Sequence, residues 1–462
     1  MGDQDQETSE QQDDLFYAFA RIILTRLKVF VGPLGGIPVR TRYYVSFAED
    51  CSSHTSLQTK TDYRTLLLHY QHQAFLEDET RLLEFIQQQE NLAAPVLSAY
   101  AIVFLNNFLL LDAIGDALER YNTLDLTRDQ LLESYHRYRD FWAAPSIRYK
   151  TVIPLLNFSS DVTQEVTVGT TIVLSPFTPD EKTQLWNSDV DYYPNVLIPI
   201  EYNAFLRSKY KLACTHLQEQ NKEYSTEEIN KELLDVLTAL RLTKAGNVGA
   251  PAIFENSELY SMAMGTPMIT RTDDYDVRQS GAEYGITEAE LSQVISLYAN
   301  LQRLNSLSRR GGLVVALRRF NRAYSREIGE DKIIDLTIAL ESCLLAGETK
   351  ELSYRFALRG AALLSKSKDP KETKKLLKAI YDARSSIVHD GKTLAELKRD
   401  NRQTPSGHAT QEFLRQSEEL ARDILREYII QMSNRHLPVK EFNNQLENLI
   451  IEHLTSTEQA GG

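Results

Sequence analysis

The chain has 462 residues, of which 42% are hydrophobic, which is enough for a sizeable buried core and more than one core usually supports. Its formal net charge of -13 excludes a protein that coats nucleic acid or an anionic membrane through bulk charge. The three cysteines, Cys51, Cys214 and Cys343, form no Cys-x-x-Cys pair, so the sequence predicts a reducing, cytoplasmic setting.

The N-terminal third is predicted to be helical after a short tail. Residues 1–14 are rich in Asp, Glu and Gln and predict a disordered acidic tail. Residues 15–144 form a mainly helical region, because their apolar residues recur at helical spacing. Within it, Arg42–Phe47 is typical of a strand, and Pro95–Leu111 of a buried helix that is too short and too polar to cross a bilayer. The sequence therefore predicts no export signal and no membrane association.

Residues 145–275 are predicted to form a mixed, β-containing middle domain. Three apolar, β-branched runs predict its strands: Tyr149–Phe158, Val166–Leu174 and Val196–Tyr202. Thr178 is placed to cap a short helix, and Thr226–Leu242 has the spacing of a longer one. The Gly- and Pro-rich stretch Gly246–Pro267 predicts a long loop or linker.

The C-terminal residues 287–460 are predicted to be helical almost throughout, so the expected fold class is α+β and mainly α-helical. The predicted helices are Thr287–Ser308, Leu313–Ile328, Asp331–Ala346, Glu351–Leu364, Lys371–Ser386, Gln411–Ser433 and Val439–Leu454. The polar stretch Lys392–His408 predicts a loop, since it carries Pro405 and Gly407.

One short segment of this region carries chemistry. Residues 312–392 hold 16 Lys and Arg against 11 Asp and Glu, although the chain as a whole is acidic. Near their end, Arg384 and His389 are separated by four residues. A guanidinium binds phosphate bidentately, and an imidazole moves a proton near neutral pH, so this pair suits RNA cleavage without a metal. The sequence predicts no metal site and no cofactor.

Four sequence blocks in residues 313–392 resemble the Apea-like HEPN domain, a helical module of prokaryotic proteins. The blocks are Leu317–Ala323, Asp331–Glu341, Phe356–Leu364 and Tyr381–Gly391. The resemblance implies a C-terminal HEPN-type helical bundle that pairs with a second copy. It also implies that Arg384 and His389 form the Arg-x4-His motif of a metal-independent ribonuclease. Asp382, Ser385 and Glu341 are expected to support it, although many members have a larger polar residue where this chain has Ser385.

In that mechanism His389 accepts the proton of the ribose 2′-hydroxyl or donates one to the leaving 5′-oxygen, while Arg384 stabilises the charged phosphorane. Residues five apart on an unbroken helix lie about 140° apart around its axis, so either the helix bends or a partner completes the site. The structural alternative is that Arg384 bonds a buried carboxylate such as Glu341, and that His389 finishes the last helical turn.

A basic face is a second candidate element. Arg318, Arg322 and Arg326 recur every fourth residue, so they are expected to share one helix face that either follows an RNA backbone or is simply solvated. The resulting hypothesis is a homodimeric ribonuclease, a toxin-like or antiphage defence effector that its N-terminal domains regulate in response to a protein or phage-derived trigger. The alternative is a catalytically inactive HEPN module that binds RNA or a protein.

Overall fold

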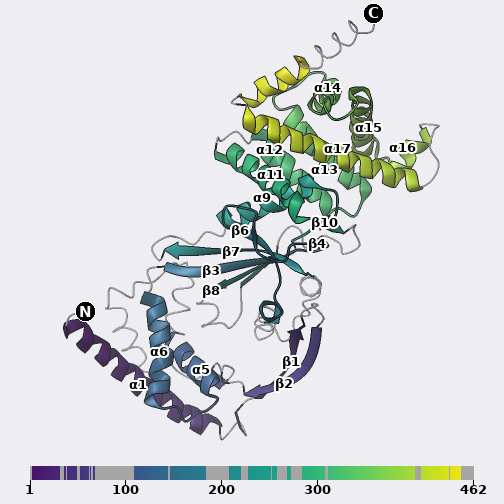
Figure 1. Cartoon of the computed structure of the whole chain (residues 1–462). Coiled ribbons are helices and arrows are strands. Elements are labelled where there is room, and N and C mark those ends of the chain that lie inside the picture. The colour runs from purple at the N-terminus through teal and green to yellow at the C-terminus, as the bar shows by residue number, and fades with distance from the viewer. Residues whose placement is uncertain are drawn as a thin grey trace, which may run out of the picture.

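The computed structural model describes residues 3–31, 36–37, 39–48, 53–61, 63, 66–67, 109–143, 146–183, 208–219, 227–250, 252–257, 268–271, 283–306, 311–400, 407–435 and 437–448. The protein is mainly α-helical with a small antiparallel sheet. Figure 1 shows the N-terminal helices at one end, the sheet in the middle and a helical C-terminal part at the other end.

The N-terminal part contains the helices α1 (Asp3–Val31), α5 (Leu109–Tyr121) and α6 (Arg128–Ala143) and the hairpin of β1 (Val39–Phe47) and β2 (Ser53–Thr61). The helices enclose a buried apolar cluster in which the rings of Phe16 and Tyr135 stack at 4.2 Å. The strand prediction at Arg42–Phe47 is confirmed by β1. Most of the predicted helix Pro95–Leu111 lies outside the described residues, and its end belongs to α5.

The prediction of a disordered tail over residues 1–14 is wrong for its larger part, since α1 begins at Asp3. Cations of α6 compensate the acidic residues at the end of this stretch. Arg139 Nη1 lies 3.5 Å from Asp13 Oδ1, and Arg128 Nη2 lies 2.6 Å from Asp14 Oδ1. Composition indicates disorder when acidic residues repel one another, and this packing supplies the missing positive charges.

A six-stranded antiparallel sheet forms the middle of the molecule, in the order β5-β6-β7-β3-β8-β9. Its strands are β3 (Ser146–Pro154), β5 (Val166–Thr167), β6 (Ile172–Pro176), β7 (Tyr210–Glu219), β8 (Ala252–Ser257) and β9 (Met268–Arg271). The strand predicted at Tyr149–Phe158 is confirmed by β3. The one predicted at Val166–Leu174 is divided in two, because Val168 N and Gly169 N both bond Ile172 O in a tight turn.

Two other predictions for the middle domain have clear outcomes. The loop or linker predicted over Gly246–Pro267 is wrong in part, since it contains β8, which pairs with both β3 and β9. The cap at Thr178 is confirmed: Glu181 N donates to Thr178 Oγ1 at 3.2 Å, and Thr178 N donates to the Glu181 carboxylate at 3.3 Å. The strand predicted over Val196–Tyr202 lies outside the described residues.

The remaining helices build the C-terminal part. They are α9 (Glu227–Thr243), α11 (Glu288–Ser306), α12 (Gly311–Tyr324), α13 (Gly329–Leu344), α14 (Leu352–Leu364), α15 (Pro370–Asp390), α16 (Leu394–Asp400), α17 (Gly407–Asn434) and a further helical stretch over 439–448. The predicted helices are confirmed, with two shifted ends: α12 stops at Tyr324 and α15 continues to Asp390. Residues 449–454 of the last predicted helix lie outside the described residues. The loop predicted over Lys392–His408 is wrong in part, because Thr393 and Glu396 form a capping box that starts α16.

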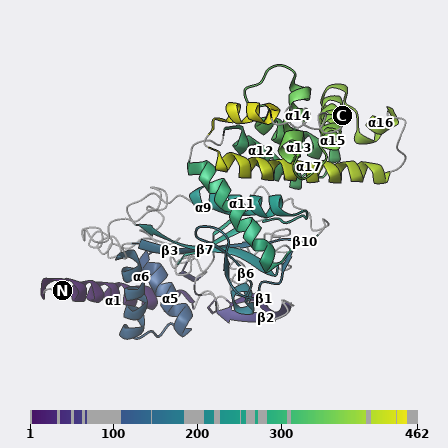
Figure 2. The same ribbon diagram turned by 45° about the horizontal axis from the view of Figure 1, so that its top comes forward.

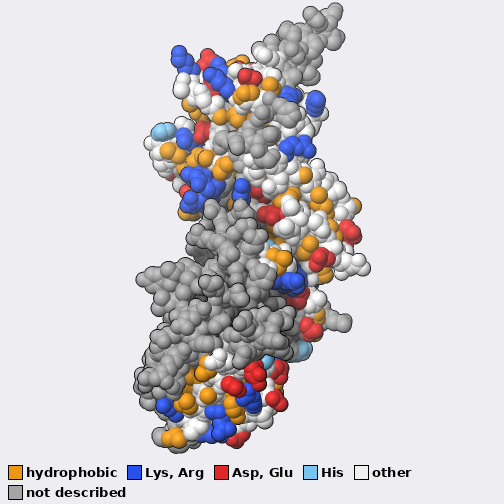
Figure 3. All heavy atoms as spheres, turned by 90° about the vertical axis from the view of Figure 1, so that its left-hand side faces the viewer, with side chains coloured by type: hydrophobic (Ala, Val, Ile, Leu, Met, Phe, Trp, Pro, Cys, Tyr) orange, Lys and Arg blue, Asp and Glu red, His pale blue; other side chains and the backbone are white. Residues whose placement is uncertain are grey.

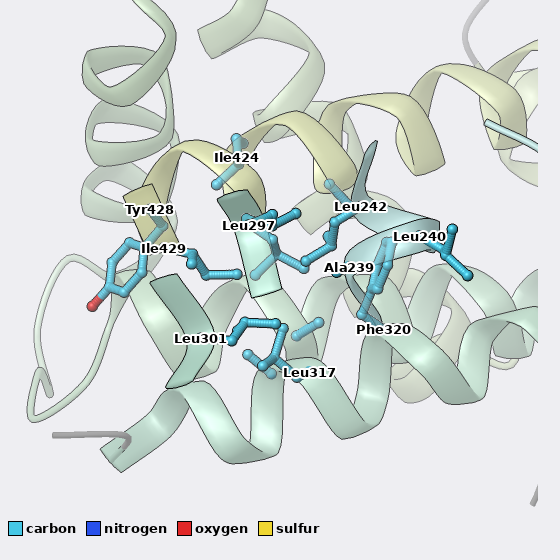
Figure 4. Packing of buried hydrophobic residues seen from close by; sticks show 14 of the residues in the cluster. Ala239, Leu240, Leu242, Leu297, Leu301, Leu317, Phe320, Ile424, Tyr428 and Ile429 are labelled. Atoms are coloured by element: carbon cyan, nitrogen blue, oxygen red, sulfur yellow. The ribbon is translucent and has the colours of Figure 1, made fainter. Parts of the chain in front are cut away.

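The middle domain and the C-terminal helices share one hydrophobic core. A single buried cluster extends from Ile153 on β3 to Leu446 after α17. Helices α9 and α11 lie between the sheet and the other helices (Figure 2), and the buried side chains of α9, α11, α12 and α17 meet in Figure 4. In addition, β4 (Phe158–Ser160) pairs in parallel with β10 (Tyr284–Ile286). The predicted boundary between residues 275 and 287 therefore does not separate two cores.

Buried arginines reinforce this junction. Arg241 of α9 donates to Val248 O at 3.0 Å and 3.1 Å and to Asn321 Oδ1 of α12 at 3.1 Å. Arg422 of α17 donates to the carbonyl oxygen of Arg241 at 2.9 Å. These bonds tie three helices together at buried polar atoms that would be costly to leave unpaired. Among the described residues, no helix is both long and apolar enough for a membrane span.

Candidate functional site

Helix α15 carries both residues of the Arg-x4-His motif. Asp369 caps its start, because its side chain accepts hydrogen bonds from Lys371 N at 2.7 Å and Glu372 N at 3.4 Å. Gly391 ends it with a left-handed φ of 66°, and the backbone N–H of Gly391 bonds Ser386 O. The helix continues unbroken through the motif, so Arg384 and His389 point about 140° apart.

Arg384 lies on the side of α15 that faces the core. It is half-buried, it follows the buried Ala383, and its Nε is shielded from solvent without a hydrogen-bond partner. Glu341 of α13 lies close by: burial raises the pKa of its carboxyl, and the positive charge of Arg384 opposes that rise. No ion pair joins the two side chains in the described part of the chain. The structural alternative required such a bond for Arg384, whereas its expectation that His389 lies in the last helical turn agrees with α15.

His389 lies on the opposite, exposed side of α15. Asp382 and Ser385 precede it by seven and four residues, so all three share one helix face. Asp382 and His389 are exposed, and Ser385 is half-buried. The five predicted site residues thus form two sets: Arg384 with Glu341 towards the core, and His389 with Ser385 and Asp382 towards solvent.

Two residues between these sets were missed by the sequence reasoning. The half-buried Tyr381 packs its ring against Phe356 at 5.4 Å, and burial together with the charge of Glu341 raises the pKa of its hydroxyl. The second missed residue is Val388, which has 47% of its surface exposed. By helix geometry Val388 lies between Arg384 and His389 around the axis. The signal in the sequence that could have found Val388 was an apolar, β-branched residue near the end of an otherwise polar helix face.

The three arginines predicted to bind RNA do not act as one set. Arg326 Nε lies 2.6 Å from Asp335 Oδ2, and Arg319 Nη1 lies 2.8 Å from Asp335 Oδ1. Asp335 is buried on α13, so both cations serve to neutralise it. Arg318 and Arg322 are exposed. Asp335 was missed in the sequence, although an aspartate within the apolar run of α13 was the signal that could have found it.

Among the residues that the structure describes, no group of three or more His, Cys, Asp or Glu side chains is arranged to hold a metal ion. Comparisons with protein families, with curated proteins and with solved structures give no match to this chain.

Proposed function

We propose that the C-terminal helical part is a metal-independent endoribonuclease of the HEPN class, with Arg384 and His389 as its catalytic residues. The observation that carries the proposal is that, among the described residues, Arg384 forms no ion pair and its buried Nε has no hydrogen-bond partner, although Glu341 lies close by. The other core-facing arginines of this part are matched: Arg359 donates to Glu447 at 2.7 Å and to Glu348 at 3.0 Å, and Arg319 and Arg326 share Asp335. A half-buried guanidinium without such a match is available for a phosphate.

The chemistry follows from the two side chains. His389, exposed near the end of α15, takes the proton of the 2′-hydroxyl, which then attacks the adjacent phosphorus and displaces the 5′-oxygen. The bond to the 5′-oxygen breaks, that oxygen takes up a proton, and a 2′,3′-cyclic phosphate remains. Arg384 holds the phosphate bidentately and stabilises the phosphorane. Hydrolysis of the cyclic phosphate gives a 3′ phosphate.

The site requires two chains in this proposal. One unbroken helix holds Arg384 and His389 on different sides, so one chain does not bring both to one phosphate. A symmetric homodimer allows His389 of each chain to face Arg384 of the other. The exposed Val388, located between them, supplies an apolar contact at such an interface. In this proposal the protein is a toxin-like or antiphage defence effector in the cytoplasm, and its N-terminal half responds to a protein or phage-derived trigger.

The test is incubation of the purified protein with mixed tRNA and mRNA in EDTA, followed by analysis of the product ends. We expect cyclic or 3′ phosphate ends, with at least a hundredfold loss of rate in Arg384→Ala and His389→Ala. His54→Ala, which removes an exposed histidine of β2, is the matched control and retains the activity. Full activity of His389→Ala would remove the catalytic assignment.

Mixing the two inactive chains tests the shared site. If each site combines Arg384 of one chain with His389 of the other, a mixed dimer of Arg384→Ala and His389→Ala contains one intact site. Random pairing of equal amounts then restores about a quarter of the wild-type rate. Sites built within single chains give no recovery, so a mixture that stays inactive contradicts the shared site while leaving the ribonuclease assignment intact.

A second candidate is a catalytically inactive module that binds RNA or a protein. The separation of Arg384 and His389 on one helix favours it, as does the small Ser385 where many members of the resembling family have a larger polar residue. As an RNA-binding module, this candidate predicts that the wild-type protein binds RNA and leaves it intact; as a protein-binding module, it predicts no affinity for RNA.

A further inference from the structure

The exposed face of α15 carries a set of lysines that runs towards His389. Lys371, Lys375, Lys378, Asp382, Ser385 and His389 follow one another at spacings of four, three, four, three and four residues, which places them on one side of the helix. Lys374 lies beside them. The lysine face, defined as Lys371, Lys374, Lys375 and Lys378, is exposed throughout. From Lys371 to His389 the helix extends about 27 Å, room for several nucleotides.

No ion pair neutralises the lysine face within the described residues. Other surface cations of the C-terminal part do have carboxylate partners: Lys332 lies 2.9 Å from Glu418, Lys368 lies 2.7 Å from Asp423, and Arg415 lies 2.7 Å from Glu412. Asp382 is the one carboxylate of the set described above, against four lysines. Figure 3, which shows another side of the molecule, has basic and acidic side chains interspersed over the C-terminal part. The lysine face is therefore a local concentration of unmatched positive charge.

An aromatic ring completes this surface. Tyr354 of α14, the helix packed beside α15, is 54% exposed. The Nζ of Lys374 lies 4.9 Å from the centre of its ring. Exposed aromatic rings beside cations provide stacking platforms for the bases of single-stranded nucleic acid. An acidic protein surface would use the lysines but would have no need of this ring.

We infer that the lysine face and Tyr354 bind a single strand of RNA and direct it along α15 to His389. This inference rests on the proposed function, because it names the substrate form and its path to the same site. The lysines neutralise successive phosphates, and Tyr354 stacks on a base upstream of the bond that is cut. Binding is expected to be steeply salt-dependent and stronger for a single strand than for a duplex.

The experiment measures fluorescence anisotropy of a labelled twelve-nucleotide RNA with the full-length protein carrying His389→Ala, so that the RNA stays intact. The triple variant Lys371→Gln, Lys375→Gln and Lys378→Gln is compared with the matched triple Lys209→Gln, Lys231→Gln and Lys350→Gln, which removes three exposed lysines elsewhere. We expect the first to weaken binding at low salt at least tenfold. It should also lower the slope of log affinity against log salt by about 2. The second should change neither.

Tyr354→Ala is expected to weaken binding about fivefold or more, whereas Tyr354→Phe keeps the ring and the affinity. Equal losses in both lysine triples, or no loss in either, would overturn the inference. Binding of polyglutamate in place of RNA, lost only in the first triple, would also overturn it and identify an acidic protein partner. RNA binding that depends on the lysine face, in a protein whose wild-type form never cleaves RNA, would uphold the inference and refute the proposed ribonuclease.

Discussion

Burial and a neighbouring charge have opposite effects on the pKa of Glu341. Its carboxyl is half-buried between α13 and α15, and burial raises its pKa, so the ionised form is disfavoured there. The charge of Arg384 reduces that penalty without forming an ion pair. Arg384 therefore both stabilises Glu341 and remains open to an anion. A phosphate bound to Arg384 would neutralise its charge and so weaken its stabilisation of the ionised Glu341.

This balance predicts a pH-dependent stability. The folded state holds the Glu341 proton to a higher pH than the unfolded chain, whose value is the ordinary 4.5, so the free energy of unfolding falls as pH rises through the interval between the two pKa values. Arg384→Ala removes the opposing charge and widens that interval. We expect it to cost about 1–2 kcal/mol at pH 7 and clearly less at pH 4.

Urea unfolding at both pH values measures this effect. Adding Glu341→Gln removes the titrating group, so Arg384→Ala should then cost the same at pH 4 and pH 7. Arg318→Ala, an exposed arginine on α12, is the matched control and should show no change between the two pH values. If Arg384→Ala lowered the free energy of unfolding by the same amount at both pH values, the coupling between Arg384 and Glu341 would be contradicted.

At the scale of elements, α15 is defined by its two ends. The Asp369 side chain bonds two backbone N–H groups of the first turn, and Pro370 follows at a position where it needs no donor. We expect Asp369→Ala to cost about 1 kcal/mol, since two donors lose their acceptor, and Asp369→Asn to cost less, since its oxygen still accepts. Urea unfolding and hydrogen exchange of the first turn measure both. If Asn were as costly as Ala, charge at the helix end would be the cause.

The helices were predictable from sequence because their signals are local. Pro370 marks the start of α15, and apolar periodicity indicates its buried side, although the helix continues past the predicted end at Ser386 as far as Asp390. The strands were harder to predict from sequence. Strand β8 forms by pairing with β3, about a hundred residues earlier in the chain, while its Gly- and Pro-rich surroundings favour a loop. Among the candidate site residues, Arg384 and His389 could be chosen from the sequence by their residue type alone. The pairing of Arg326 with Asp335 depends on the packing of α12 on α13.

At the scale of the whole molecule, the shared core decides how the parts respond to one another. Because one buried cluster joins the sheet to the C-terminal helices, these two parts are expected to unfold together. The N-terminal helices form a second cluster, which includes Tyr149 of β3. A structural change in the sheet would then affect α15 through the packing of α9 and α11. In the proposed function, regulation of α15 by the preceding domain would therefore need no flexible linker.

Two buried thiols report on this cooperativity. Cys214 lies on β7 and Cys343 on α13, and burial raises the pKa of both thiols, to about 11 for Cys214. In a Cys51→Ser background, labelling in increasing urea should modify both at the same midpoint. Leu301→Ala, which truncates a buried residue of α11, should lower both midpoints equally, at a cost of about 2–5 kcal/mol.

The matched control is Leu118→Ala, which removes the same atoms from the N-terminal cluster, whose member in the sheet is Tyr149, and should shift both midpoints less than Leu301→Ala does. Mass spectrometry of the two cysteine peptides distinguishes the sites. If Leu301→Ala shifted the midpoint of Cys343 and not that of Cys214, the sheet and the helices would be separate folding units. In the proposed function, a signal from the N-terminal parts would then have to reach His389 through a contact at the surface. Coincident shifts would instead mean that the sheet and the C-terminal helices unfold as one cooperative unit, because a cavity made in α11 would then lower the free energy of unfolding that protects Cys214 as much as that which protects Cys343.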